Sequence, residues 1–316
     1  MKSLISVDWG GTSFRAVQVD DRSELKYFRT SAVNIRTISE TGLDEICSQI
    51  RKNFSNLENS RVIWLIGAAG AADEKAAIRV KERFSAIGIP GSECHLIPDY
   101  VANHAAVLGG QEGFLSINGT GSLLYVELNG LCERRGGWGF LLDESPSGAF
   151  WGRQTLKTVL EHLEGEDHRL AIAEEFARQH YQPDLLKILA ELYQASNQQN
   201  KLGQFAEVLT RCYEESDEYA INMINTSIKV LVRQLKLLLE KIKHSETIPL
   251  SGCGGLWENW PLFHQLVSDQ IKREGLPINV KKPIFKPIWG PMVYFARENK
   301  EIKKIFNAIP NKEKTA

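Results

Sequence analysis

The first half of the chain alternates short apolar runs with glycine-containing turns, which is the pattern of β-strands. It predicts strands over Leu4–Val7, Phe14–Val19 and Val62–Ile66. Gly10 and Gly11 separate the first two strands and predict a hairpin. The small residues 67–72 lead from the third strand to a helix predicted from Asp73 to about Ile87, so the local order is strand and then helix.

A second strand–turn–strand pattern follows. Phe114–Ile117 and Leu123–Leu128 flank the turn Asn118-Gly119-Thr120-Gly121-Ser122. Aligned with residues 7–13, this segment repeats the order of apolar strand, short polar residue, glycines and hydroxyl residues. The repeat predicts two halves of related design, with a boundary near residues 109–113.

Helical periodicity dominates from about residue 147 to residue 244. One apolar stripe with spacings of three and four predicts a long core-facing helix: Ile224, Ile228, Leu231, Leu235, Leu238 and Ile242. A shorter helix is predicted over Tyr100–Leu108, with Asp99 as its N-cap because Pro98 cannot extend a preceding helix. A third glycine loop occupies residues 250–255, and a last helix is predicted around Met292–Asn299.

Charge and length restrict the class of protein. With 38 Lys and Arg against 39 Asp and Glu, the net charge is -1, which gives no electrostatic argument for nucleic acid or an anionic membrane as partner. A small-molecule partner is therefore expected. The 316 residues allow one large domain or two ordinary ones, and the composition is that of a folded globular chain.

The chain offers no signal for a membrane or for redox chemistry. The longest apolar stretch, residues 62–72, is shorter than the roughly 18 residues that cross a bilayer, and the N-terminal segment has no signal-peptide core. We expect a cytoplasmic protein. The five cysteines are scattered without a C-x-x-C pair, which indicates reduced thiols rather than a metal or redox site.

The glycine turns are the candidate chemistry, because glycine lets backbone amides approach phosphate oxygens closely. None of them fits the Walker or Rossmann pattern. Asp8 stands at the end of the first strand, where a carboxylate can hold hydrated Mg²⁺. The turn that follows can receive phosphates through Gly10, Gly11, Thr12 and Ser13, and the second turn through Gly119, Thr120, Gly121 and Ser122. Two such hairpins predict a triphosphate clamp.

These motifs resemble a known family. The chain resembles the N-acetylglucosamine kinase group of the BadF/BadG/BcrA/BcrD ATPase family. The resemblance is carried by Asp8-Trp9-Gly10-Gly11-Thr12-Ser13, by Asp99 at a helix start, by the 118–122 turn and by Gly136-Gly137-Trp138-Gly139-Phe140. That group belongs to the sugar kinase, Hsp70 and actin superfamily. The resemblance covers nearly the whole chain. It implies an α/β, duplicated ribonuclease-H-like (actin-like ATPase) fold, with ATP and sugar bound in a central cleft between two lobes.

The implied organisation is an N-terminal lobe over residues 1–112, a larger C-terminal lobe over 113–289, and a terminal helix in 290–316 that is expected to return to the first lobe. The implied activity is transfer of the ATP γ-phosphoryl group to the 6-hydroxyl of N-acetylglucosamine, with Mg²⁺ as cofactor. Glucosamine and N-acetylmuramic acid stay open as substrates. A homodimer stays open as well, because the relatives resemble dimers.

Matching residues carry the implied roles. Asp99 corresponds to the catalytic base, and Gly254 and Gly255 correspond to the adenosine loop. The implied sugar contacts are Asn34, Asp99, Thr120, Gly137, Trp138 and Glu144. The residues alone also allow Asp99 to be a plain N-cap and Trp138 to be a core residue. Trp138 interpreted as a sugar contact offers an apolar wall to a pyranose ring or an acetamido methyl group.

One segment departs from the family. The family usually continues after Gly-Trp-Gly with Gly-Asp-Glu-Gly-Ser-Gly, whereas residues 143–148 read Asp-Glu-Ser-Pro-Ser-Gly. Glu144 takes the place of the family's aspartate, with Asp143 as a neighbouring carboxylate, and Pro146 replaces a glycine. The departure bears on which sugar is preferred.

Two other functions fit the residues less well. Part of the family activates 2-hydroxyacyl-CoA dehydratases through an iron-sulfur cluster, but Cys132 has no second cysteine at a helpful spacing. A non-enzymatic ATP switch or transcription regulator is disfavoured because no helix-turn-helix pattern precedes the first hairpin. The seven histidines show no local metal-binding pairs.

Overall fold

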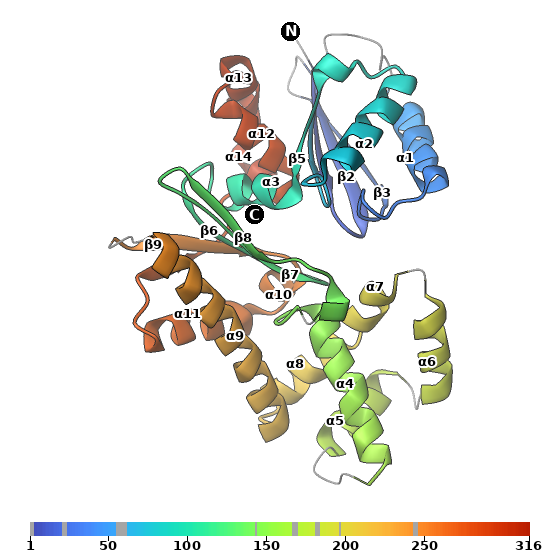
Figure 1. Ribbon diagram of the computed structural model, residues 1–316, viewed down its shortest axis with the longest axis vertical. Helices are drawn as coiled ribbons and strands as arrows, with labels where there is room; N and C mark the ends of the chain where they lie inside the picture. The colour runs from blue at the N-terminus through green and yellow to red at the C-terminus, as the bar shows by residue number, and fades with distance from the viewer. Residues whose placement is uncertain are drawn as a thin grey trace. The chain divides into compact units, whose positions relative to one another are not determined.

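The computed structural model describes residues 3–20, 24–54, 62–142, 144–165, 170–180, 184–195, 197–242 and 246–316. Its strands form two sheets (Figure 1). Their bounds are β1 (Ser3–Trp9), β2 (Ser13–Val19), β3 (Leu25–Ser31), β4 (Val62–Ala68), β5 (Cys94–Pro98), β6 (Gly113–Asn118), β7 (Ser122–Leu128), β8 (Leu131–Gly136), β9 (Ile248–Cys253) and β10 (Ile278–Lys281).

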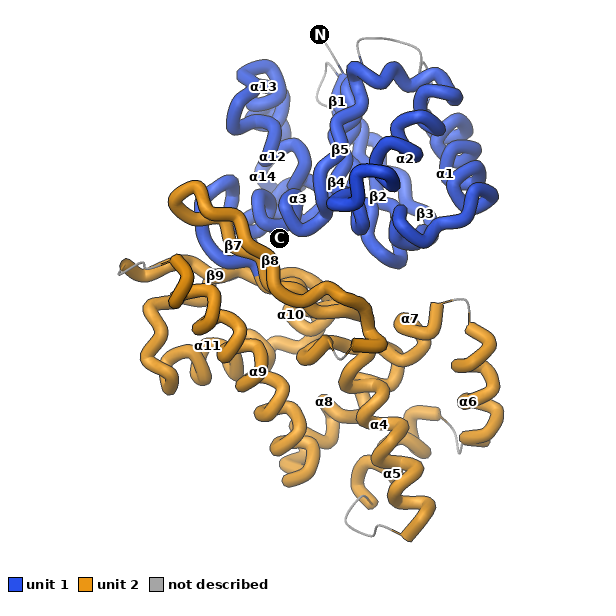
Figure 2. The backbone as a smooth tube through the Cα atoms, viewed as in Figure 1, with its two compact units in different colours: residues 1–115, 282–316 blue, residues 116–281 orange. Residues whose placement is uncertain are grey.

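The chain divides into two compact units, coloured separately in Figure 2. Unit 1 comprises residues 1–115 and 282–316, and unit 2 comprises residues 116–281. Unit 2 is therefore a continuous segment inserted into unit 1. The sequence places the divisions at 112/113 and 289/290, whereas the units of the structure change at 115/116 and 281/282.

The two sheets repeat one topology. The first has the order β3-β2-β1-β4-β5, and the second, followed from its β8 edge, has the equivalent order β8-β7-β6-β9-β10. In the first sheet β2–β3 is antiparallel and β4–β5 is parallel, and their counterparts in the second sheet, β7–β8 and β9–β10, are paired in the same way. The hairpins aligned in the sequence thus occupy the same place in each sheet, which confirms the predicted duplication.

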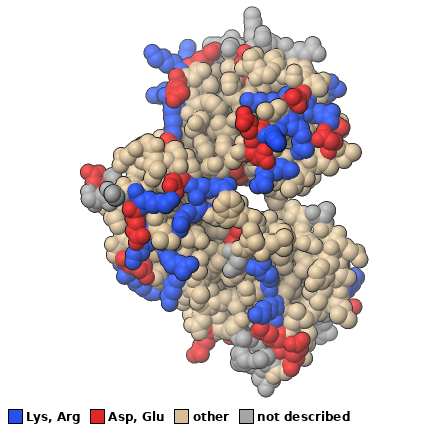
Figure 3. Space-filling view, in the orientation of Figure 1, with Lys and Arg blue, Asp and Glu red and all other residues tan. Residues whose placement is uncertain are grey.

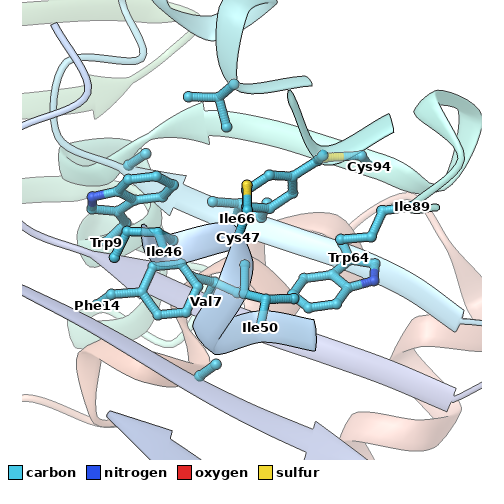
Figure 4. Close-up of a cluster of buried hydrophobic side chains, with 14 of the residues drawn as sticks. Val7, Trp9, Phe14, Ile46, Cys47, Ile50, Trp64, Ile66, Ile89 and Cys94 are labelled. Carbon is cyan, nitrogen blue, oxygen red and sulfur yellow. The ribbon is translucent and has the colours of Figure 1, made fainter. Parts of the chain in front are cut away.

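Helices cover both faces of the first sheet (Figure 1). β4 is buried along its whole length, and its alternate side chains enter different cores. Trp64 and Ile66 pack on the side of α1 (Glu40–Asn53) and α2 (Glu74–Ala86). Figure 4 shows both side chains in a cluster with residues of α1. This is why the sequence of β4 is a continuous apolar run, since a strand covered on both faces needs apolar residues at every position.

The opposite core of unit 1 depends on residues from both ends of its sequence. Leu4 and Leu65 pack there with Trp289 and Met292, all of which are fully buried. The helices on this side are α3 (Asp99–Val107), α12 (Gly290–Ala296), α13 (Lys300–Ala308) and α14 (Asn311–Lys314). The returning segment therefore completes one face of the first sheet.

Unit 2 carries most of the helical residues. Its helices are α4 (Gly148–Leu163), α5 (Leu170–Gln179), α6 (Leu185–Gln194), α7 (Gln198–Gly203), α8 (Ala206–Glu214), α9 (Glu218–Ile242), α10 (Gly255–Asn259) and α11 (Pro261–Arg273). α9 is the helix predicted from the 3–4 stripe, and Ile224, Leu231 and Leu238 of that stripe are fully buried. None of the helices within the described parts of the chain has the length and apolar character that a membrane span needs.

One local prediction is wrong. Asp99 is the first helical residue of α3, and Pro98 before it takes the N-cap position without a side-chain hydrogen bond. The proline ring carries no hydrogen-bond acceptor, so α3 begins without a side-chain cap and with the Asp99 carboxylate in its first turn. The sequence pattern also does not predict the edge strands β3, β5, β8 and β10, nor the inner strand β9.

Candidate active site

Two candidate carboxylates of unit 1 stand at the carboxyl ends of parallel strands. Asp8, near the end of β1, lies opposite Gly67 of β4, and Asp99 follows β5 directly. The Asp99 Cα lies 3.8 Å from the point where a Cβ at Gly67 would stand. In open α/β sheets ligands bind at this edge, so the strand order brings Asp8 and Asp99 to the edge where chemistry is expected.

Asp8 is the residue expected to hold magnesium. Its carboxylate is buried and forms an ion pair of 2.5 Å with Arg15, which lies directly opposite in the β1–β2 ladder. A cation is thus already at this carboxylate, and the described residues contain no cluster of three or more His, Cys, Asp or Glu side chains suited to a metal. One carboxylate is an incomplete ligand set, so a hydrated Mg²⁺ beside Asp8 would need most of its oxygen ligands from water or from a bound phosphate.

The first glycine turn joins β1 to β2. It is closed by a hydrogen bond of 2.9 Å from Gly10 N to Ser13 O, and Gly11 and Thr12 are exposed. A Cβ at Gly11 would meet nothing within 4 Å, so the space beside this exposed residue is open to a ligand.

Asn34 lies in a loop that contacts this turn region. Trp9 donates its ring N–H to Val33 O at 3.0 Å, and Ile35 N donates to Ala69 O at 3.0 Å. The Asn34 side-chain oxygen accepts from Arg36 N at 2.9 Å and would clash with a Cβ at Gly70. Gly70 has a φ of +95°, so both its backbone and the space that Asn34 fills require glycine.

Arg79 of α2 anchors the same loop. Its guanidinium donates to Ile35 O at 2.7 Å, to Ile38 O at 3.0 Å and to the Glu40 carboxylate at 3.3 Å. Arg83, one turn later, forms ion pairs with the carboxylates of Glu40 and Asp44. Charges of both signs intermingle over α1 and α2 in Figure 3, and Arg79 is the member of this group that holds backbone near Asn34.

We expect Arg79→Ala to lower the free energy of unfolding by about 2 kcal/mol, because two carbonyls lose a charged donor. Arg83→Ala is the matched control and should cost less, since exposed ion pairs contribute little. Urea denaturation followed by circular dichroism measures both. Equal losses for the two variants would show that Arg79 has no special anchoring role.

The second glycine turn, in unit 2, rests on a buried hydrogen-bond network around Asn118. The Asn118 amide donates to Ser122 Oγ at 3.1 Å and to Pro146 O at 2.8 Å, and its oxygen accepts from Trp257 at 2.8 Å. The carbonyls of Gly119 and Thr120 accept from the amides of residues 148 and 149 at the start of α4. The turn is therefore fixed from both sides.

The Gly136–Gly139 loop follows β8. Gly136, Gly137 and Gly139 all have positive φ, at 77°, 70° and 106°, a conformation that other residues rarely adopt. The loop presents Trp138, whose side chain is 70% exposed with the Arg134 guanidinium 4.8 Å from the ring centroid. The alternative that Trp138 is a core residue is wrong.

Glu144 connects this loop to the second turn. Its carboxylate accepts from Ser122 N at 3.3 Å and also from Gly139 N. Each carboxylate oxygen has a second lone pair, so Glu144 can still accept hydrogen bonds from a ligand. Its neighbour Asp143 lies outside the described residues.

Gly254 and Gly255 pack against the second turn. Gly254 has a φ of 100°, and a Cβ there would lie 2.7 Å from Gly119 N. The structure thus brings the candidate adenosine loop and the candidate phosphate turn together within unit 2. Close backbone packing is a sufficient reason for glycine at 254, whatever ligand binds beside it.

The cysteines give no support to a redox site. Burial raises the pKa of Cys47 and of Cys94 to about 11, and burial with nearby carboxylates raises that of Cys212 to about 12, so these thiols are protonated at neutral pH. Cys132 is an exposed free thiol.

Two polar residues reach these loops without any signal in the sequence pattern. Arg79 contacts carbonyls more than 40 positions earlier, and Gln199 of α7 reaches the second turn. Neither stands in a motif, and no local spacing connects either residue to its contact.

Two sheets of equivalent strand order, with glycine turns at their first hairpins, define a duplicated ribonuclease-H-like α/β fold, and solved structures of sugar kinases share this fold. The BadF/BadG/BcrA/BcrD ATPase family matches residues 5–294, and the chain belongs to this family. ATP is accordingly the nucleotide that the family context implies.

Named relatives agree with this placement. The chain is 23% identical over 270 residues to the N-acetylmuramic acid/N-acetylglucosamine kinase of Clostridium acetobutylicum, covering 82% of this chain and 87% of that protein. Two solved structures described as N-acetylglucosamine kinases share the fold. The structure from Chromobacterium violaceum has a TM-score of 0.72 and 16% sequence identity, and the match covers 92% of this chain and 98% of that one. The structure from Porphyromonas gingivalis has a TM-score of 0.70 and 18% identity, and the match covers 95% of this chain and 100% of that one.

Proposed function

We propose that the protein is an ATP-dependent amino-sugar kinase that phosphorylates N-acetylglucosamine at its 6-hydroxyl, giving N-acetylglucosamine 6-phosphate and ADP. The observation that carries the proposal is the Glu144 carboxylate, fixed by amides of the second glycine turn and of the Gly136–Gly139 loop, beside exposed Trp138. A fixed carboxylate next to an exposed aromatic face suits a pyranose, whose hydroxyls donate and whose ring carbons pack on aromatic surfaces.

Asp99 is the proposed catalytic base in unit 1. Its carboxylate would accept the proton of the sugar 6-hydroxyl while the oxygen forms a bond to the γ-phosphorus and the bond from that phosphorus to the bridging oxygen of ADP breaks. Its place as the first residue of α3 supports this role, because a helix start favours a charged carboxylate.

The glycine turns are the proposed phosphate sites. The turns Gly10–Ser13 in unit 1 and Gly119–Ser122 in unit 2 would bind phosphate oxygens, with Gly254 and Gly255 flanking the adenosine. The Gly10, Gly119 and Ser122 amides already donate to Ser13 O, Gly121 O and Glu144, so the other amides and the hydroxyls of the turns would be the donors. Asp8 would hold Mg²⁺ through water, and the ion would supply positive charge that neutralises the phosphates. The support is the open space over Gly11 and the rigid hydrogen-bonded frame of the second turn.

Sugar recognition is assigned to Asn34 in unit 1 and to Thr120, Gly137, Trp138 and Glu144 in unit 2. Asn34 is held in one orientation by its turn and by Gly70. Rigid polar groups discriminate among sugars because a wrong hydroxyl pattern leaves them without partners.

We expect Trp138→Ala to raise the sugar KM about tenfold, which corresponds to about 1.4 kcal/mol of lost binding. Stability should hardly change, because the ring is 70% exposed. Leu142→Ala is the matched control, since it removes another exposed apolar side chain of the same segment. Steady-state kinetics with varied sugar measures the effect, and an unchanged KM would remove Trp138 from the sugar site.

The direct test is a coupled ADP-release screen over hexoses, hexosamines and their N-acetyl forms, with the phosphorylated position assigned by NMR. The proposal predicts the highest kcat/KM for N-acetylglucosamine and phosphate on O6. ADP release that no sugar stimulates, or phosphate at another position, contradicts it.

N-acetylmuramic acid is the second candidate substrate. The Clostridium relative is named for both sugars, and the Arg134 guanidinium against the Trp138 ring is a cation that a sugar-borne carboxylate would pair with. Including this sugar in the same screen tests it: a kcat/KM above that of N-acetylglucosamine would make it the preferred substrate.

A further inference from the structure

A short helix of unit 2, α7, is rigidly attached to the second glycine turn. At its end, Leu202 O occupies the space that a Cβ at Gly152 would need, so α7 and α4 meet backbone to backbone. Gly203 likewise lies against Thr120, whose Cγ2 is 3.6 Å from a Cβ built at that glycine. The position of α7 relative to the turn is thus set by packing that leaves no room for adjustment.

Polar contacts fix α7 at its start and in its last turn. The Asn197 side chain accepts from Asn200 N at 3.1 Å and caps the helix, and Lys201 pairs with Glu191 of α6 at 2.8 Å. The backbone from which the side chains of α7 extend is therefore held in one position.

From this fixed backbone the Gln199 side chain extends to the second glycine turn. Its amide nitrogen lies 3.0 Å from the point where a Cβ at Gly121 would stand, and a Glu144 carboxylate oxygen lies 2.5 Å from the same point. A carboxamide and a carboxylate from different elements therefore occupy the space over Gly121. Any larger residue at 121 would displace one or both of them.

We propose that Gln199 is a specificity-determining residue that binds one ring hydroxyl of the sugar. The adjacent ring hydroxyl donates its hydrogen bond to Glu144. The inference rests on the proposed sugar-kinase function. Its chemical basis is complementarity: a carboxylate only accepts hydrogen bonds, whereas a carboxamide both donates and accepts, so the pair matches two adjacent hydroxyls. A site built this way rejects sugars that lack one of those hydroxyls.

The test is a double-mutant cycle between the protein and the sugar. We expect Gln199→Ala to raise the sugar KM about tenfold while kcat and the ATP KM change less than about threefold. In the wild type, 3-deoxy and 4-deoxy analogues should both lose kcat/KM. With Gln199→Ala, the loss for one of them should disappear, because its partner has been removed.

Two further variants separate recognition from a structural effect. Gln198→Ala removes the neighbouring glutamine, whose side chain donates toward the α6 end, to Tyr193 O at 3.4 Å, and should keep wild-type KM values. Gln199→Glu keeps the size of the side chain but sets a second negative charge over Gly121, so it should weaken sugar binding at least as much as alanine does.

The outcomes distinguish this inference from the proposed function. If the wild type phosphorylates no amino sugar, the proposed function fails, and the inference with it. If the wild type is active and Gln199→Ala shows wild-type sugar KM and undiminished losses for both deoxy sugars, the inference alone is overturned.

Discussion

Asp99→Asn is expected to lower kcat by on the order of 10², equivalent to about 2.7 kcal/mol of barrier, with little change in the Kd for ATP. Asparagine has nearly the same size as aspartate but cannot take the proton of an attacking hydroxyl. Single-turnover measurements with excess enzyme would separate the phosphoryl-transfer step from ADP release.

Glu112→Gln is the matched control for this change. It also removes one negative charge from unit 1, from the exposed loop beyond the other end of α3. Wild-type kcat is expected for the control. Full activity of Asp99→Asn would remove Asp99 from the mechanism and return it to a helix-start residue.

Glu144→Gln is expected to lower kcat/KM for the sugar about 30-fold, which corresponds to a loss of about 2 kcal/mol. In the wild type both carboxylate oxygens accept from backbone amides, at Ser122 and Gly139. A glutamine has only one oxygen, so its NH₂ group must face one of these N–H donors. The kinetic loss should appear mainly in the sugar KM.

Glu133→Gln controls for charge and surface position, because that glutamate, on β8, pairs with Lys241 at 2.7 Å. It should leave the sugar KM unchanged. If Glu144→Gln also retained the wild-type sugar KM, the Glu144 carboxylate would serve only to connect the second glycine turn to the Gly136–Gly139 loop and would not bind the sugar.

The parts of the fold that can be predicted from the sequence are those whose burial follows a regular pattern. β4 is apolar at every position because both its faces are covered, and α9 keeps its 3–4 stripe over its length. Edge strands carry no such pattern. β3 has no fully buried position and includes Lys26 and Arg29, so its pairing with β2 depends on the neighbouring strand more than on its own residues.

The site divides in the same way. Turns that require glycine, such as residues 136–139, can be recognised from the amino-acid sequence alone. Their partners cannot: Gln199 stands in the polar run of residues 197–200, and only the packing of α7 on α4 brings it over Gly121. Asp99 is the first helical residue and not the N-cap because Pro98 takes the N-cap position. The sequence restricts the backbone of Pro98 but does not fix where the helix begins.

The insertion of unit 2 within unit 1 affects the order in which the protein can be completed during synthesis. A nascent chain that has emerged up to residue 281 contains all of unit 2. At that stage the first sheet still lacks Trp289 and Met292, which fill one of its two cores, so Leu4 and Leu65 remain without their buried partners. Domains usually mature from the N-terminus onward. Here unit 2, which is synthesised after the first strands of unit 1, can complete its fold first. The first strands of unit 1 become fully packed only when the C-terminal helices of the chain have been made.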